Sequence, residues 1–324
     1  LIKSFFDLIY AKLKLANNNF FRKNVEVNKI KLSEKSNKNF IIYEISKSRI
    51  YSDNSQNVAV IKNNTIIPNM SFQQVNGRLK KKQYNSVLKY GTPSLIKKIS
   101  GTVLTLVQGG SGNNYFHFIF DIIPKIYLIK KEKLFQKIDF FYVSRPTKWQ
   151  IKIFKLLQIS KKKLIDSTKS KHISADQIIA IDHPWYQKGY MQDQVKNIPE
   201  WIVTSNRQLF LNKAKKFKSK KKIFLDRSNS LYNHCQIYNQ KEINEWIDNN
   251  HLGTYYTENL SFEKQIFLFS NASTIIGAHG AAFTNIIFCK PGTKIIEIIP
   301  TDHPNRKCER ICKILKLNNF RIAT

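Results

Sequence analysis

The stretch that decides the fold is IIGAHGAAFTN at residues 275–285, which is followed by PGTKIIE at residues 291–297. An apolar, β-branched run ends at Gly277, and Pro291 and Gly292 precede a second apolar run. This pattern predicts a strand, a tight glycine turn, a helix and a second strand. A turn of this kind presents backbone N–H groups at the positive end of a helix dipole, where a phosphate or diphosphate can bind.

A glycine-rich turn between a strand and a helix does not identify a function alone. Many α/β domains have one for close packing, and this spacing differs from the G-x-G-x-x-G pattern of dinucleotide-binding domains. A second group of polar residues lies far upstream, in GNNYFHFIFDIIP at residues 112–124. His117 and Asp121 are four residues apart there, so on a helix they would share one face.

Three further motifs lie between these two stretches. IFLDR at residues 223–227 places Arg227 after a predicted strand, Asn239 opens a predicted helix, and LSFEKQ occupies residues 260–265. Taken in order, the motifs resemble those of glycosyltransferase family 61 over about residues 100–300. The family pattern is N-x-x-H-x-x-x-D, an arginine after a strand, an asparagine at a helix start, L-S-F-x-E/K-Q, G-x-H-G-A-x-x-T-N and P-G-x-x-x-x-E.

The chain follows the family pattern with one departure. Asn113 or Asn114 fills the first position of the first motif. Many members carry a second basic residue shortly after the arginine, whereas this chain has SNSLYNH at residues 228–234. Either one phosphate contact is missing here or His234 supplies it.

The resemblance implies a GT-B-like α/β fold, in which two Rossmann-like domains face each other across a cleft. The regular alternation of predicted strands and helices in the second half favours a parallel sheet with helices on both faces. We expect an acceptor-side domain at residues 1–217, strand-rich at first and then α/β, and a nucleotide-sugar-binding Rossmann-like domain at residues 218–324. The lysine-rich run at residues 218–222 would be the linker between them.

The resemblance implies transfer of a sugar from a nucleoside-diphosphate donor, with no cofactor besides that donor. The departing diphosphate gains negative charge, so the site needs fixed cations or N–H donors at that point. Since the sequence has no D-x-D motif, we expect a metal-independent enzyme. Thr284 and Asn285 could instead cap and pack their helix, and Glu297 could be a salt-bridged strand end. The expected donor-binding residues are Arg227, Gly277, His279, Gly280, Ala281, Thr284, Asn285 and Glu297.

The acceptor hydroxyl needs a base, which an inverting displacement places opposite the leaving group. We expect His117 to be the base with Asp121 as its partner, or Asp121 itself to be the base. Alternatively, the two residues brace their helix. His183, His303 and Asp182 are weaker candidates, because lone histidines are usually structural.

The charge of the chain raises a competing function. Its formal net charge is +32, from 54 lysines and arginines against 22 acidic residues, and such a field attracts anionic partners. A non-enzymatic nucleic-acid or polyanion binder is therefore the alternative, although arginines are scarce and no known nucleic-acid motif is present. A Rossmann-type oxidoreductase is disfavoured, because the dinucleotide pattern is absent. We expect a nucleotide-sugar donor and a glycan acceptor as partners, and no nucleic acid.

The cysteines and the N-terminal segment bear on location. Four unevenly placed cysteines are too few for a disulfide framework, which favours a reducing compartment. Residues 1–23 combine bulky apolar and basic side chains, as in a helix lying on an anionic membrane or packed on its own domain. We expect a cytoplasmic enzyme of surface polysaccharide biosynthesis, such as capsule or lipopolysaccharide, with peripheral contact at the inner membrane face as an option. The sequence does not identify the sugar, because family members use xylose, arabinose or N-acetylglucosamine donors.

Overall fold

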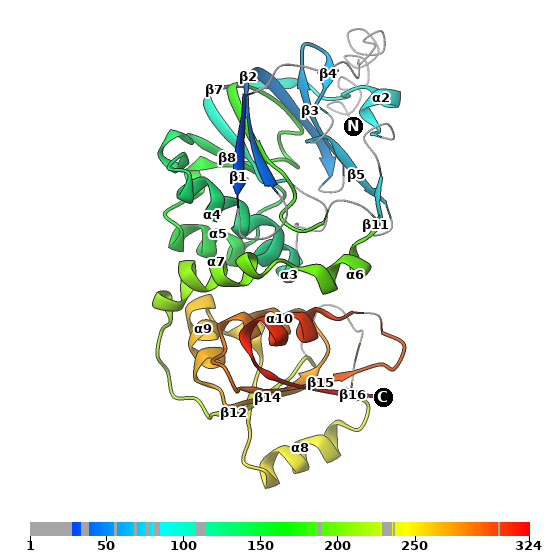
Figure 1. Cartoon of the computed structure of the whole chain (residues 1–324), viewed down its shortest axis with the longest axis vertical. Coiled ribbons are helices and arrows are strands. Elements are labelled where there is room, and N and C mark those ends of the chain that lie inside the picture. Colours follow the sequence, from blue (N-terminus) through cyan, green and yellow to red (C-terminus); the bar gives the residue numbers. More distant parts are fainter. Residues whose placement is uncertain are drawn as a thin grey trace. The chain divides into compact units, whose positions relative to one another are not determined.

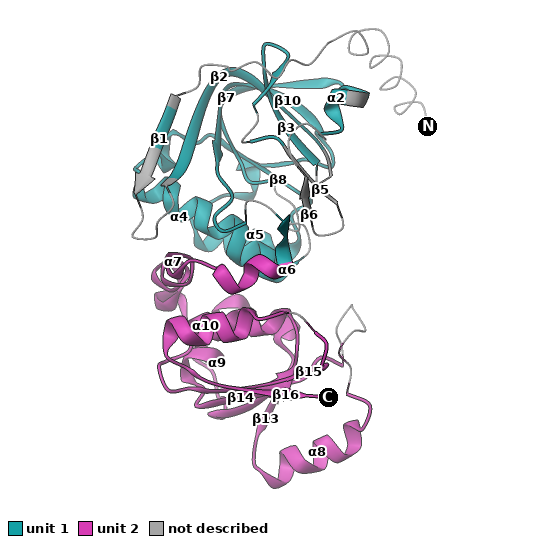
Figure 2. Ribbon diagram, turned by 45° about the vertical axis from the view of Figure 1, so that its right-hand side comes forward, with its two compact units in different colours: residues 1–191 teal, residues 192–324 magenta. Residues whose placement is uncertain are grey.

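A computed structural model describes the chain as two compact units, residues 1–191 and residues 192–324 (Figure 2). The expected helix at residues 1–23, Asn113 and His234 lie outside the described residues. Among the residues that the structure describes, no helix is both long and apolar enough to cross a bilayer. The described residues are 28–33, 39–54, 57–67, 70–75, 78–80, 85–107, 114–186, 189–228, 235, 237–303 and 305–324.

The described part of unit 1 is built on an 11-stranded mixed sheet (Figure 1). The order along it is β11-β6-β5-β3-β2-β10-β7-β8-β9, with β1 paired to β2 and β4 to β3. The four strands β10, β7, β8 and β9 are mutually parallel, and the other pairings are antiparallel. The strands are β1 (Asn28–Ser33), β2 (Asn39–Asn54), β3 (Asn57–Lys62), β4 (Thr65–Ile66), β5 (Phe72–Val75), β6 (Arg78–Lys80), β7 (Ile96–Thr105), β8 (Phe140–Val143), β9 (Leu164–Asp166), β10 (His172–Ile181) and β11 (Gly189–Tyr190).

The helices of unit 1 lie mainly after β7 and β8. The helix expected to carry His117 and Asp121 has three parts, because Ile123 N–H bonds the carbonyl of Phe118, five residues back. Pro124 has no N–H to continue an α-helical ladder, and a π turn accommodates this break. The helices are α2 (Val87–Tyr90), α3 (Tyr115–His117), the π-helix η3 (Phe118–Ile122), α4 (Ile123–Lys131), η4 (Phe135–Lys137), α5 (Lys148–Leu156), η5 (Lys161–Lys163) and, across the boundary, α6 (Met191–Gln194).

Unit 2 contains a five-stranded parallel sheet in the order β13-β12-β14-β15-β16. This confirms the parallel sheet predicted from the alternating pattern. Helices α8 and α10 cover opposite faces of the sheet (Figures 1 and 2). The strands are β12 (Lys222–Leu225), β13 (Gly253–Tyr255), β14 (Thr274–Ala278), β15 (Lys294–Ile299) and β16 (Asn318–Ala323), and the helices are η6 (Val195–Asn197), α7 (Glu200–Phe210), η7 (Leu211–Lys213), α8 (Gln240–Asn249), η8 (Thr257–Asn259), α9 (Phe262–Asn271), η9 (Ala281–Phe288) and α10 (Lys307–Leu315).

Helix α7 packs within unit 2, so the division of the chain differs from the expected one. Arg207 on α7 donates hydrogen bonds to the carbonyls of Ile287 at 2.6 Å and Cys289 at 2.8 Å. Arg310 on α10 donates to the carbonyl of Ile198 at 2.8 Å. The boundary predicted after residue 217 therefore lies inside unit 2. The lysine-rich run resembles a linker only because it is an exposed connection that leads into β12.

The helix expected after the glycine turn is present as a 3-10 helix over Ala281–Phe288. Its last carbonyls are satisfied by Arg207 instead of by a further helical turn. Strand β16 was not predicted, because it is an edge strand whose Phe320 and Ile322 are about half exposed, so it lacks a continuous apolar run.

Candidate functional site

In unit 1, a polar cluster lies at the point where the strand order reverses. The chain forms β7, β8 and β9 side by side and then returns as β10 on the other side of β7. Ligands of open α/β sheets bind at such a point, at the carboxyl ends of the strands. Asp182 and His183 directly follow β10, and His183 meets the helix of His117 and Asp121 there. The topology thus brings chemically active side chains to the expected edge of the sheet.

Asp121 is the centre of this cluster and is fully buried. Its Oδ2 lies 2.9 Å from Nδ1 of His117, and its Oδ1 accepts a hydrogen bond of 2.7 Å from Nε1 of Trp185. Nε2 of His183 lies 3.7 Å from the same Oδ2. The carboxylate is therefore surrounded by donors, as a buried charge requires.

The two histidines beside Asp121 differ in their state. His183 Nδ1 accepts the backbone N–H groups of Trp185 at 3.3 Å and Tyr186 at 2.9 Å, which assigns its proton to Nε2. Burial lowers the pKa of His183, and Asp121 opposes this only in part. His183 is thus a neutral donor facing the carboxylate, whereas His117 reaches it through Nδ1.

The environment of Asp121 determines which group can take a proton. Burial raises the pKa of Asp121, but His117 and His183 outweigh it and hold the pKa well below its usual value. A carboxylate held in this way is a weak base. With Nδ1 of His117 donating to Asp121, the lone pair of the ring is on Nε2, where it can accept a proton. The geometry thus favours His117 over Asp121 as the base.

Sequence reasoning missed two members of this cluster. Lys125, one turn after Asp121 on the same helix, is 3% exposed, and burial lowers its pKa to about 8 against the fields of Asp121 and Asp182. Trp185 is 3% exposed and binds Asp121 as described. The four-residue spacing from Asp121 to Lys125 was the available signal for the lysine. No sequence spacing could have indicated the tryptophan, because it is 64 residues away from Asp121.

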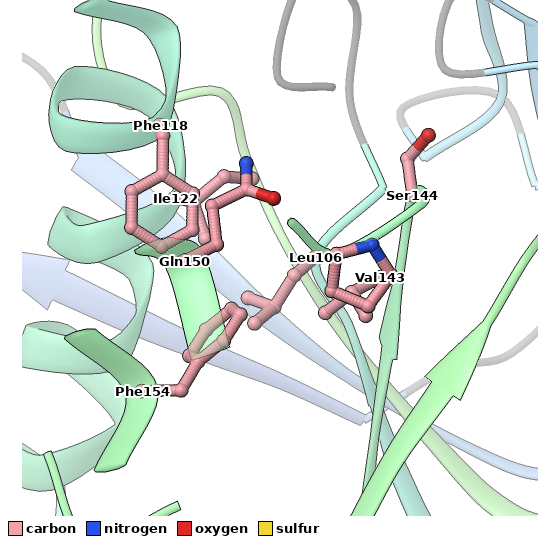
Figure 3. A pocket seen from close by; sticks show the side chains of 8 residues that line it. Leu106, Phe118, Ile122, Val143, Ser144, Gln150 and Phe154 are labelled. Atoms are coloured by element: carbon pink, nitrogen blue, oxygen red, sulfur yellow. The ribbon is translucent and has the colours of Figure 1, made fainter. Parts of the chain in front are cut away.

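A small, mainly apolar pocket lies at the carboxyl ends of β7 and β8 (Figure 3). Phe118 and Ile122 line it from the π-helical turn that carries Asp121. The pocket therefore adjoins the helical turn that carries Asp121. Its lining residues are Leu106, Phe118, Ile122, Val143, Ser144, Pro146, Gln150 and Phe154.

In unit 2, the glycine turn also lies where the strand order reverses. From β12 the chain passes to β13 on one side and then to β14 on the other. The carboxyl ends of β12 and β14 are adjacent and parallel, with Leu225 paired to Gly277. Arg227 follows β12 and His279 follows β14, so both reach the edge of the sheet where ligands bind in such folds.

Gly277 is required for space, and a Cβ at Gly280 would compete with the end of the Arg227 side chain. A Cβ at Gly277 would lie 2.8 Å from the carbonyl oxygen of Leu225, so the neighbouring strands could not approach. A Cβ at Gly280 would lie 2.8 Å from Cζ of Arg227. Arg227 uses this space to donate through Nη1 to the carbonyl of His279. The structure thus brings Arg227 to the turn that contains His279 and Gly280, all three of which are expected at the donor site.

Beneath the turn, His279 and Glu297 form a buried pair. His279 Nδ1 lies 2.6 Å from Oε1 of Glu297, which also accepts a bond of 3.0 Å from the thiol of Cys308. The residues are 5% and 3% exposed, respectively. Burial raises the pKa of Glu297, but His279 outweighs it and the pKa is lowered. Burial lowers the pKa of His279, against its bond to Glu297.

The contact with Glu297 determines how the ring of His279 is oriented. Glu297 holds the ring of His279 through Nδ1, so the remaining ring nitrogen, Nε2, is available for other contacts. The ring of His303 lies beside it, with centroids 4.4 Å apart. The carboxylate lies under the turn, and the expected contact of Glu297 with the donor stays a prediction.

The remaining candidates lie on η9. Asn285 is 1% exposed and donates to Oε1 of Gln265 at 2.9 Å, while Gln265 donates to the carbonyl of Thr257 at 2.8 Å. Asn285 therefore ties η9 to the start of α9. Thr284 is fully buried, and its hydroxyl has no hydrogen-bond partner within the described residues. Ala281 is exposed at the first position of the helix.

A family model described as Glycosyltransferase 61 matches residues 115–296, which is more than half of the chain. The matched region begins before His117 and ends one residue before Glu297. A search of curated proteins finds no match.

Proposed function

The chain belongs to glycosyltransferase family 61 and is accordingly a glycosyltransferase, and we propose that it transfers a sugar from a nucleoside-diphosphate donor to a glycan hydroxyl with inversion. The observation that carries this proposal is the pairing of two sites, each at a strand-order reversal. One site places Arg227 at the glycine turn that leads into η9, and the other contains the pair of His117 and Asp121. A displacement reaction needs both kinds of site.

The donor's diphosphate would bind at the turn after β14. Arg227 and the N–H groups at the start of η9 supply positive charge where the leaving group becomes more negative. With Nδ1 bonded to Glu297, Nε2 of His279 would donate to a phosphate oxygen in the imidazolium form, which the negative charge of the bound diphosphate favours. These roles need no metal ion, and together with the missing D-x-D motif they support metal-independent transfer.

The acceptor hydroxyl would be deprotonated by Nε2 of His117. Asp121 holds the ring through Nδ1 and stabilises the imidazolium that forms. Trp185 fixes the carboxylate in turn, and Nε2 of His183 faces it at 3.7 Å. A base placed on the face of the sugar opposite the leaving diphosphate gives inversion. We further propose a GT-B arrangement, in which the two sites face each other across a cleft.

The acceptor proposed is a surface glycan, and the place of action is the cytoplasm or the inner membrane face. The large positive charge supports an anionic surface or an anionic glycan as the neighbour of the enzyme. The same charge is the basis of the competing function, a non-enzymatic polyanion binder. That function predicts binding of duplex DNA and heparin with a steep salt dependence.

The deciding experiment is calorimetry of the whole chain with UDP, GDP, CDP, ADP and dTDP, with and without EDTA. We expect one of them to bind, EDTA to have no effect, and the matching nucleotide sugar to be consumed with a glycan acceptor. Proton NMR of the anomeric centre then reports inversion. If none of the five nucleotides binds while duplex DNA does, the transferase mechanism proposed here is wrong.

A further inference from the structure

Lys307 is a buried cation at the start of α10 that no sequence motif includes. Its side chain lies in the interior, with the residue 4% exposed, and its Nζ donates a hydrogen bond of 2.8 Å to the carbonyl oxygen of Gly280. The family match ends at residue 296, so Lys307 lies outside the matched region. An ammonium is costly to bury, and its contact with the glycine turn therefore calls for a physical reason.

The bond from Lys307 fixes one peptide plane of the turn. The peptide between Gly280 and Ala281 is trans, because the described residues contain no cis peptide. In a trans peptide the carbonyl and the N–H point in opposite directions. Since Lys307 holds the carbonyl of Gly280, the N–H of Ala281 is directed away from Lys307.

The conformation of Gly280 determines what lies on the other side. Its backbone is fully extended, with φ 176° and ψ −179°. In extended backbone, the carbonyl before a residue and the N–H after it lie on the same edge. Arg227 donates to the carbonyl of His279, which marks that edge. The N–H of Ala281 and the guanidinium of Arg227 are thus on one side of the turn.

That side is also the accessible one. Ala281 is exposed and Arg227 is partly exposed, whereas Lys307 is buried near Glu297. An anion approaching from solvent would meet a backbone donor and a guanidinium together. Lys307 is too deeply buried to meet the same anion first.

We propose that Lys307 is a positioning residue, which locks the Gly280–Ala281 peptide so that the Ala281 N–H donates, beside Arg227, to the diphosphate of the donor. The proposal rests on the proposed function, because it assigns a role at that donor site. The N–H of Phe283 also donates to the Gly280 carbonyl, at 3.2 Å, and glycine permits many backbone conformations, so without Lys307 one longer bond opposes rotation of the peptide. A rotated peptide presents the Gly280 carbonyl to the anion, and the two repel each other.

The test uses the full chain labelled with 15N-alanine, and inorganic pyrophosphate as the probe common to all nucleoside diphosphates. We expect the Ala281 amide proton to move downfield on titration of the wild type, with the peak assigned through Ala281→Gly. In Lys307→Met we expect that shift to be lost and pyrophosphate affinity to fall at least tenfold. Lys307→Arg, which keeps the donor, is expected to restore both. Arg306→Met is the matched control, because Arg306 is half exposed and paired with Glu309.

Each outcome decides the proposal. An unchanged Ala281 shift and affinity in Lys307→Met overturn it. If that variant does not fold, the wild-type titration decides, since binding of pyrophosphate without movement of the Ala281 amide overturns the proposal by itself. If the wild type binds neither pyrophosphate nor any nucleoside diphosphate, the proposed function fails and this inference fails with it. That result is distinct from binding without the amide shift.

Discussion

Nδ1 of His117, the last residue of α3, lies 2.9 Å from Oδ2 of Asp121, and the π turn that contains Asp121 begins directly after His117. Trp185 holds the second oxygen of the same carboxylate at 2.7 Å. The carboxylate therefore cannot rotate without losing a bond, and the imidazole is held with Nε2 as its basic atom. The imidazole of His117 is the proposed base, and Asp121 and Trp185 hold it in place. Different variants can therefore test the two roles.

Replacing His117 by Ala removes the proposed base and leaves the turn after β14 intact. We expect kcat to fall by about 10²–10⁴-fold, as is usual for loss of a general base, with nucleoside-diphosphate affinity unchanged. Initial rates of transfer and calorimetry measure the two quantities. His251→Ala is the control, because His251 is an exposed histidine of unit 2. A kcat within threefold of the wild type would show that His117 is not the base.

Replacing Trp185 by Phe tests the support of the carboxylate. The ring keeps most of its packing but loses its N–H, which leaves the fully buried Oδ1 of Asp121 short of a donor. We expect the free energy of unfolding to fall by about 1–3 kcal/mol, the cost of an unmet buried polar group. Denaturant unfolding measures it. Trp246→Phe is the matched control, since Trp246 is 44% exposed, and equal stabilities for the two variants would contradict the prediction.

Acid destabilisation of unit 1 should depend on His172. This residue is fully buried, its Nδ1 lies 3.2 Å from the carbonyl of Ser94, and its Nε2 has no hydrogen-bond partner within the described residues. Burial lowers its pKa from 6.5 to about 4, and Arg49 adds to the effect. Between these two values the unfolded chain binds a proton that the folded chain does not.

The folded state should therefore lose stability as the pH falls from 6.5 to 4, by about 3 kcal/mol from this residue. Below pH 4 the contribution is constant, and above pH 6.5 the penalty is absent. The measurement is the free energy of unfolding of the wild type minus that of His172→Gln across this range. His251→Gln serves as the reference substitution. A pH-independent difference for His172→Gln would show that the group is not buried in neutral form.

Much of unit 2 was predictable from local pattern. Apolar runs, glycines and prolines mark strands and turns directly, so the strand, helix and strand expected around residues 275–297 are present as β14, η9 and β15. The edge strand β16 was not predictable, because half of it faces solvent. The position of α7 was also not predictable, since Arg207 bonds carbonyls 80 and 82 residues away. Contacts of this length leave no local signal.

The residues of the candidate sites were likewise predictable only where they lie within short motifs. His117 with Asp121, and Arg227 with the glycine turn, follow from spacing within short motifs. Trp185 and Lys307 complete the two sites only through tertiary packing, because each meets its partner across a long stretch of chain. Asn285 shows the same limit, and its expected role at the donor site stays a prediction. Its amide bonds Gln265, which a reading of its own helix could not reveal.

Arg227 and Gly280 should act as one unit in binding the donor, because the guanidinium occupies the space that a Cβ on Gly280 would need. Arg227→Met removes the cation, and we expect nucleoside-diphosphate affinity to fall by about 1.5–3 kcal/mol, the usual range for a charged hydrogen bond. Gly280→Ala keeps the arginine but displaces it from the turn, so a loss of similar size is expected. The double variant should lose little more than either single one, since both changes remove the same contact. Calorimetry of the four proteins measures this cycle, with thermal unfolding to confirm that each is folded. Additive losses would mean that Gly280 affects the donor through something other than Arg227.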